Sequence, residues 1–180
     1  MQPEHLQQIM GFYIEDAKDH LNSSERDLLD LESLLTDREK INGLGCRFKS
    51  VKGGAAMLGL SRIQTIAHDL EDFCRAIELC GYPVKADQKL KDLLMQVFYA
   101  LKELVGQLSE SSGLTDEKAA QVMSEIEPVR DALMAHLNWL VNQSCPRSQL
   151  EVAIAPDSAD EIPSLDDLQS LIDDLLLDSS

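Results

Sequence analysis

The residues whose types and spacing could do chemistry lie in positions 48–59. Lys49 and Lys52 are three positions apart, so on a helix they share one face. Gly53 and Gly54 follow at once, and inside a helix each costs about 1 kcal/mol relative to alanine. A helix that keeps two such residues usually needs another body to approach closely at that point. The pattern therefore predicts a functional surface, with a pair of ordinary solvated lysines as the alternative.

Patterns typical of enzymes and metal sites are missing from the sequence. A phosphate-binding loop places its lysine after the glycines, whereas Lys52 precedes them. The chain contains no H-E-x-x-H motif, no zinc-type spacing of cysteine and histidine, no G-x-S-x-G motif and no calcium loop. We therefore predict no enzyme active site, no bound metal and no cofactor.

The composition restricts the class of partner and the compartment. The 180 residues carry a net charge of −16, which repels the phosphates of nucleic acids and of anionic membrane surfaces. No apolar run is long enough to cross a membrane, and no signal peptide is evident, so we expect a soluble, cytoplasmic protein. The four cysteines lack the spacing of a disulfide framework, so we expect reduced thiols at Cys46, Cys74, Cys80 and Cys145.

Apolar residues recur at steps of three and four along most of the chain, which predicts helices and no strand. Patterns typical of capping boxes at residues 36–39 and 61–64 mark the starts of the second and third helices. Pro128 should bend or split the last helix. The predicted helices cover residues 4–35, 37–58, 61–80, 87–108 and a fifth stretch from the Thr115 cap to about 142. The predicted fold is an all-α antiparallel helical bundle.

The C-terminal part of the chain has a different character. Residues 145–164 contain three prolines and scattered small polar residues, which is typical of a linker. Residues 164–178 alternate leucines with pairs of aspartates, at spacings that indicate a short acidic amphipathic helix. This helix could fold back on the bundle or dock on a partner. We therefore divide the chain into a bundle of residues 1–144 and a linker with an acidic tail of residues 145–180.

The sequence from Ser50 to Gly59 resembles the signature of histidine-phosphotransfer (HPt) domains, especially the N-terminal module of CheA-type chemotaxis and pilus-motility kinases. That signature is a histidine, a lysine three residues later, a glycine after the lysine, and a further glycine that ends the helix. Residues 67–72, which include His68 and Glu71, resemble the H-x-L-E segment of the same family. The resemblance covers residues 4–140 and implies a four-helix bundle with a fifth helix. It also implies a monomeric phosphorelay component of two-component signal transduction, which binds a response-regulator receiver domain or a histidine kinase.

The chain departs from this signature at its central residue, because Lys49 stands where the family has the phosphoacceptor histidine. A neutral imidazole has a reference pKa of about 6.5 and offers a nucleophilic nitrogen, whereas a lysine ammonium, at about 10.4, has no free lone pair. The resemblance implies that Lys52 neutralises phosphoryl oxygens, that Gly53 lets the receiver approach, and that Glu71 orients the acceptor. In this chain Glu71 is then available to pair with Lys49. The implied docking surface consists of Lys49, Ser50, Lys52, Gly53, Gly59, His68 and Glu71.

Three hypotheses follow for the function. The first is a pseudo-HPt module that docks a receiver or kinase domain without relaying phosphate. The second is a helical scaffold that binds partners through its acidic tail. The third is an active HPt module that uses His68 as a substitute phosphoacceptor; the remaining histidines, His5, His20 and His136, have no neighbours typical of a site and are expected to be solvated.

Overall fold

The computed structural model describes residues 3–81, 83–110 and 113–144. These residues form six helices and no strand, which confirms the predicted all-α bundle. The helices are α1 (Pro3–Leu29), α2 (Leu31–Thr36), α3 (Arg38–Met57), α4 (Ser61–Cys80), α5 (Gln88–Gln107) and α6 (Asp116–Ser144).

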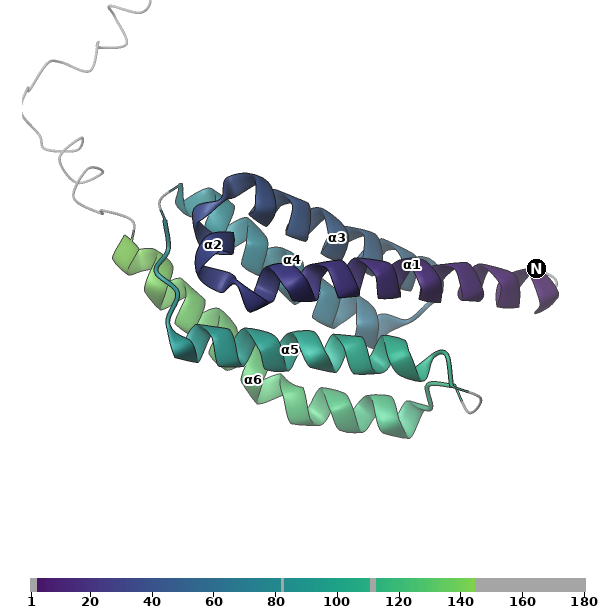
Figure 1. Cartoon of the computed structure of the whole chain (residues 1–180). Coiled ribbons are helices and arrows are strands. Elements are labelled where there is room, and N and C mark those ends of the chain that lie inside the picture. Colours follow the sequence, from purple (N-terminus) through teal and green to yellow (C-terminus); the bar gives the residue numbers. More distant parts are fainter. Residues whose placement is uncertain (1–2, 82, 111–112, 145–180) are drawn as a thin grey trace, which may run out of the picture. The chain divides into compact units, whose positions relative to one another are not determined.

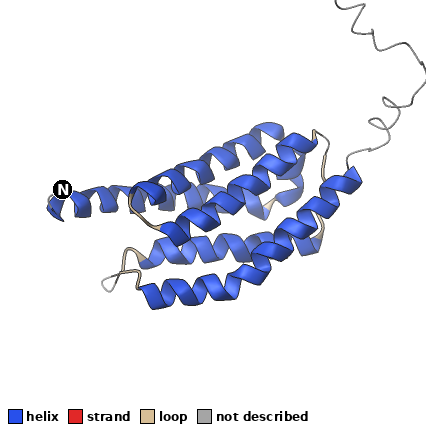
Figure 2. Ribbon diagram, turned by 180° about the vertical axis from the view of Figure 1, so that it is seen from behind, coloured by secondary structure: helices blue, strands red, loops and turns tan. Residues whose placement is uncertain are grey.

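Helices α1, α3, α4 and α5 close a four-helix bundle, in which each packs against two of the others (Figure 1). The short connection of residues 58–60 makes α3 and α4 antiparallel neighbours, as expected for a bundle. Helix α6 packs on α4 and α5, and Figure 2 shows this arrangement from behind. The core contains the fully buried Phe48, Phe73 and Phe98, and the rings of Phe48 and Phe98 meet edge to face at 6.4 Å.

The first predicted helix is interrupted, so its continuous range of 4–35 was wrong. α1 ends at Leu29, and the carboxylate of Asp30 accepts a hydrogen bond from the Ser33 amide at 3.4 Å, which starts α2. Ser24 explains the seven-residue gap in the apolar stripe of α1. It is fully buried, donates to the carbonyl oxygen of His20 at 2.8 Å and accepts from Arg47 Nε at 3.1 Å.

Both predicted capping boxes also need correction. Asp37, not Thr36, caps α3, because its carboxylate accepts from the amides of Glu39 and Lys40 at 3.0 and 3.2 Å. The Thr36 hydroxyl instead donates back to the carbonyl oxygen of Ser33 at the end of α2. α4 begins at Ser61 without a side-chain cap. The predicted start of α5 is confirmed, because the Asp87 carboxylate accepts from the Leu90 amide at 2.7 Å.

Helix α6 continues through Pro128 and bends along its length (Figure 1). Ion pairs attach it to the bundle at three levels: Arg62 with Asp116, Asp69 with Arg130, and Asp87 with His136.

The prediction that His136 is solvated was wrong. Its side chain is only 11% exposed, and its Nε2 lies 2.8 and 2.9 Å from the two carboxylate oxygens of Asp87. The His136 ring also stacks on the exposed Trp139. The register of two helices that are distant in sequence therefore gives this histidine a structural role.

Within the described ranges, every helix is too short or too polar to span a lipid bilayer. The predicted linker and acidic helix of residues 145–180 lie outside the described residues. The division of the chain at residue 144 accordingly stays a prediction.

Candidate functional site

The apolar residues of α3 determine which of its side chains reach the surface. Phe48, Val51 and Ala55 are fully buried against the neighbouring helices. Because these three positions face the core, the residues between them must face outward. Lys49, Ser50 and Gly53 are exposed and Lys52 is half-buried. The structure thus brings the signature residues of α3 together on one outer face of the bundle.

Glu71 lies on α4, next to this face of α3, and is only 8% exposed. One of its carboxylate oxygens is ion-paired with the Lys52 ammonium, and the other lies 3.5 Å from the guanidinium of Arg75. A nearly buried carboxylate is stabilised by such pairing, because an unpaired buried charge is very costly. The prediction that Glu71 pairs with Lys49 was wrong, because Lys52 and Arg75 already occupy both of its oxygens.

Lys49 extends from α3 one turn before Lys52. It makes no hydrogen bond or ion pair with any residue that the structure describes. Together with residues of α3 and α4 it lines a shallow cavity of about 160 Å³, whose other members are Asn42, Gly45, Cys46, Glu71, Cys74, Arg75 and Glu78. Burial raises the pKa of the Cys74 thiol in the floor of this region, so Cys74 is an inert packing residue and offers no nucleophile.

The two adjacent glycines of α3, Gly53 and Gly54, have different surroundings. A Cβ atom at Gly54 would lie 2.5 Å from Cδ2 of the Tyr13 ring, so only glycine lets α1 approach α3 this closely. The same tyrosine donates a hydrogen bond to the carbonyl oxygen of Val51 at 3.3 Å. A Cβ atom at Gly53 would meet nothing within 4 Å. Gly54 therefore serves packing inside the chain, whereas no contact in the described structure requires glycine at position 53.

Two further glycines shape the helices that carry the site. Gly59 has a φ of +73°, and the Leu60 amide just beyond it donates to the carbonyl oxygen of Ala55 at 2.9 Å, so the predicted end of α3 is confirmed. The sequence predictions assigned no packing role to Gly45. A Cβ atom there would lie 3.3 Å from Cβ of Cys74, so Gly45 permits the close approach of α3 and α4 next to Lys49. A glycine spaced to face the neighbouring helix was the available signal.

His68 lies on α4, one turn before Glu71, and its side chain is 53% exposed. Its Nδ1 lies 3.1 Å from an Asp72 carboxylate oxygen, and Arg75 approaches the same carboxylate at 3.9 Å. Within the described residues, Nε2 of His68 has no partner. His68 therefore belongs to the same row of charged side chains on α4 as Glu71 and Arg75.

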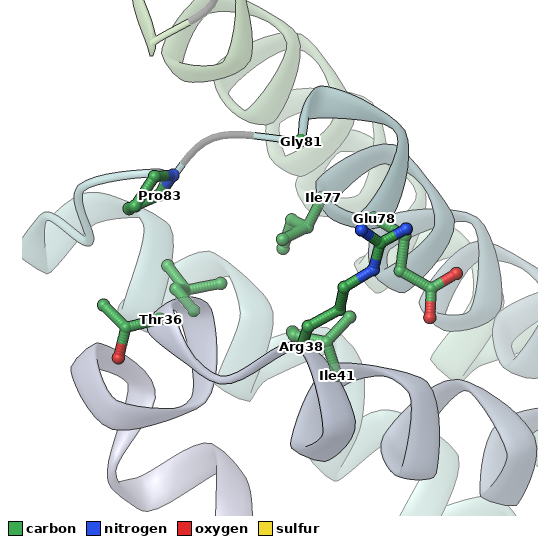
Figure 3. A pocket seen from close by; sticks show the side chains of 8 residues that line it. Thr36, Arg38, Ile41, Ile77, Glu78, Gly81 and Pro83 are labelled. Carbon is green, nitrogen blue, oxygen red and sulfur yellow. The ribbon is translucent and has the colours of Figure 1, made fainter.

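A second cavity, also of about 160 Å³, lies at the end of the bundle where α2, α3 and α4 meet (Figure 3). Figure 3 shows Arg38 and Glu78 at its rim, with Ile41 and Ile77 toward its interior. The Thr36 hydroxyl in its lining donates to the backbone carbonyl oxygens of Glu32 and Ser33 and so is not activated by a base. In the described parts of the chain, no three histidine, cysteine or acidic side chains gather in a way that could hold a metal ion.

Comparison with known proteins places this geometry in context. Residues 8–111 match the family model of the Hpt domain. Among solved structures, the chain is similar to the phosphorylated P1 domain of CheA3, crystallised in complex with CheY6 from R. sphaeroides. The TM-score is 0.59 at 21% sequence identity, and the likeness covers 74% of this chain and 98% of that one, which supports the shared fold. No curated protein matches the chain.

Proposed function

The chain belongs to the Hpt domain family, and from this premise we propose that it is a pseudo-HPt module whose α3–α4 face docks a receiver domain without relaying phosphate. The single observation that carries the proposal is the side chain at the acceptor position. Lys49 is exposed at the first position of an otherwise complete signature, and it has no ion-pair partner among the described residues. The family's surface is retained, while the group that would accept phosphate is replaced.

The chemistry of lysine accounts for the proposed loss of transfer. An exposed ammonium holds its lone pair in an N–H bond, so it cannot attack a phosphorus atom as a neutral imidazole does. The surrounding residues keep roles that suit docking. Gly53 offers an open approach, and Lys52 stays fixed near the acceptor position through Glu71. The likeness to a P1 domain crystallised with CheY6 supports a response-regulator receiver as the class of partner.

Restoring the histidine tests the proposal directly. Lys49→His should accept radiolabelled phosphate from a phosphorylated receiver or kinase, whereas the unchanged protein and Lys49→Gln should not. Lys89→His, which places a histidine on an exposed position of α5 away from this face, is the matched control. An authentic HPt domain in the same reaction shows that the phosphodonor works. Label on the unchanged protein would contradict the proposal, and failure of Lys49→His beside a working HPt domain would favour the scaffold hypothesis.

One observation favours a second candidate, the active HPt module that uses His68. The bond from His68 Nδ1 to Asp72 holds the ring by one nitrogen and leaves Nε2 free to act as a nucleophile. This candidate predicts acid-labile phosphate on the unchanged protein that His68→Gln abolishes. Asp72→Asn should reduce the labelling rate, whereas Asp16→Asn, which affects the similar pair with His20 on α1, should leave it unchanged.

A further inference from the structure

We infer that Lys49 makes docking compete with the divalent cation of the receiver, so that this chain binds receivers in their metal-free state. The inference rests on the proposed docking function and adds how that docking is regulated. It comes from the distribution of paired and unpaired charges on the α3–α4 face.

Three cationic side chains lie around the acceptor position, and two of them are already neutralised. Lys52 is ion-paired with Glu71. Arg75 lies 3.5 Å from Glu71 and 3.9 Å from Asp72. Lys49 has no such partner in the part of the chain that the structure describes. The positive charge that remains available to a partner is therefore concentrated at position 49.

The chemistry of phosphoryl transfer determines what position 49 meets in a docked receiver. In a working HPt domain, the acceptor atom must reach the atom that donates or receives the phosphoryl group. Such sites hold Mg²⁺ through one or two carboxylates together with phosphate oxygens. A docked Lys49 would place its ammonium against the same carboxylates. Because the ammonium and Mg²⁺ are both cations that need the same ligands, binding one must weaken binding of the other.

Linkage gives the size of the effect. If Lys49 and Mg²⁺ exclude each other completely, the apparent Kd for the receiver is multiplied by one plus the ratio of the Mg²⁺ concentration to its own Kd. At ten times that Kd, docking should weaken about elevenfold. A histidine at position 49 lacks the permanent charge, so an ordinary HPt surface has no reason to show this antagonism.

The experiment measures receiver affinity by titration calorimetry in EDTA and in MgCl₂ at matched ionic strength. The probes are purified receiver domains from the source organism, with CheY6 as a reference. The unchanged protein is compared with Lys49→Gln and with Lys89→Gln, which removes an exposed lysine of α5. At an Mg²⁺ concentration of ten times its Kd for the receiver, we expect about elevenfold weaker binding for the unchanged protein and for Lys89→Gln. For Lys49→Gln we expect less than about a twofold change, because the competing cation is removed.

The possible outcomes separate the inference from the function beneath it. Binding that is equally tight with and without Mg²⁺ overturns the inference but leaves receiver docking intact. An equal loss in Lys49→Gln also overturns it, because the antagonism would then arise from another charge. Absence of saturable binding in both buffers, for every receiver, overturns the proposed docking function itself.

Discussion

The two adjacent glycines of α3 should respond in opposite ways to the same substitution. In Gly54→Ala, the new Cβ would lie 2.5 and 2.7 Å from two carbons of the Tyr13 ring, and Tyr13 is itself only 8% exposed. The ring cannot turn aside without losing its hydrogen bond to the Val51 carbonyl. Overpacking of this kind costs about 1–3 kcal/mol, and the lost hydrogen bond about 1 kcal/mol more. Alanine returns about 1 kcal/mol of helix propensity, so the net loss should be about 1–3 kcal/mol.

Gly53→Ala meets no neighbour within 4 Å, so it should keep the propensity gain and stabilise the fold by up to about 1 kcal/mol. Urea unfolding followed by circular dichroism at 222 nm measures both changes as shifts in midpoint at constant slope. In a Tyr13→Ala background, Gly54→Ala should no longer destabilise, because the clashing ring is absent. The reasoning is refuted if Gly54→Ala stabilises the unchanged background, or if the penalty persists without the tyrosine ring.

The attachment of α6 supplies two further predictions. Arg130→Ala leaves the largely covered carboxylate of Asp69 unpaired and should lower the free energy of unfolding by about 1–3 kcal/mol. Lys118→Ala removes an exposed pair with Glu110 and should change the free energy of unfolding by less than about 1 kcal/mol. Thermal unfolding compares the two variants, and equal losses would contradict a stabilising role for the Arg130–Asp69 pair. Desolvation raises the pKa of Asp87, but hydrogen bonds from the Leu90 amide and His136 outweigh it, so the folded-state pKa is lowered. The Asp87 charge therefore stabilises the fold above its unfolded pKa of about 4, and this contribution is lost as the pH falls through the lower folded-state value. Between pH 7 and pH 3, the free energy of unfolding from urea titrations should fall more for the unchanged protein than for Asp87→Asn, by at most about 1 kcal/mol. Parallel pH dependences of the two proteins would exclude this role.

Local patterns in the sequence were enough to predict most of the helices, because apolar spacing and chain breaks act within a few residues. The end of α3 at Gly59 and the start of α5 at Asp87 were predicted for the correct physical reason. The interruption at Asp30 was not, because apolar residues continue at helical spacing across it. Asp37 replaced the expected Thr36 as the cap of α3, because α3 begins at Arg38 and the hydroxyl of Thr36 bonds backward to carbonyl oxygens of α2.

The sequence nominated the residues of the candidate site, but it did not reveal how their charges pair. The signature nominated Lys49 and Lys52, and the H-x-L-E segment nominated Glu71, but the partner of Glu71 depends on the register between α3 and α4. Gly45 permits the close approach of α3 to Cys74 of α4, and its spacing along α3 was a signal that the sequence predictions did not use. The observed pairing changes the expected distribution of charge on this surface, because Glu71 neutralises Lys52 and leaves Lys49 without an acidic partner among the described residues. A single substitution at position 49 would thus remove the nucleophile and create the free cation, so the proposed loss of transfer and the proposed mode of docking would have the same cause.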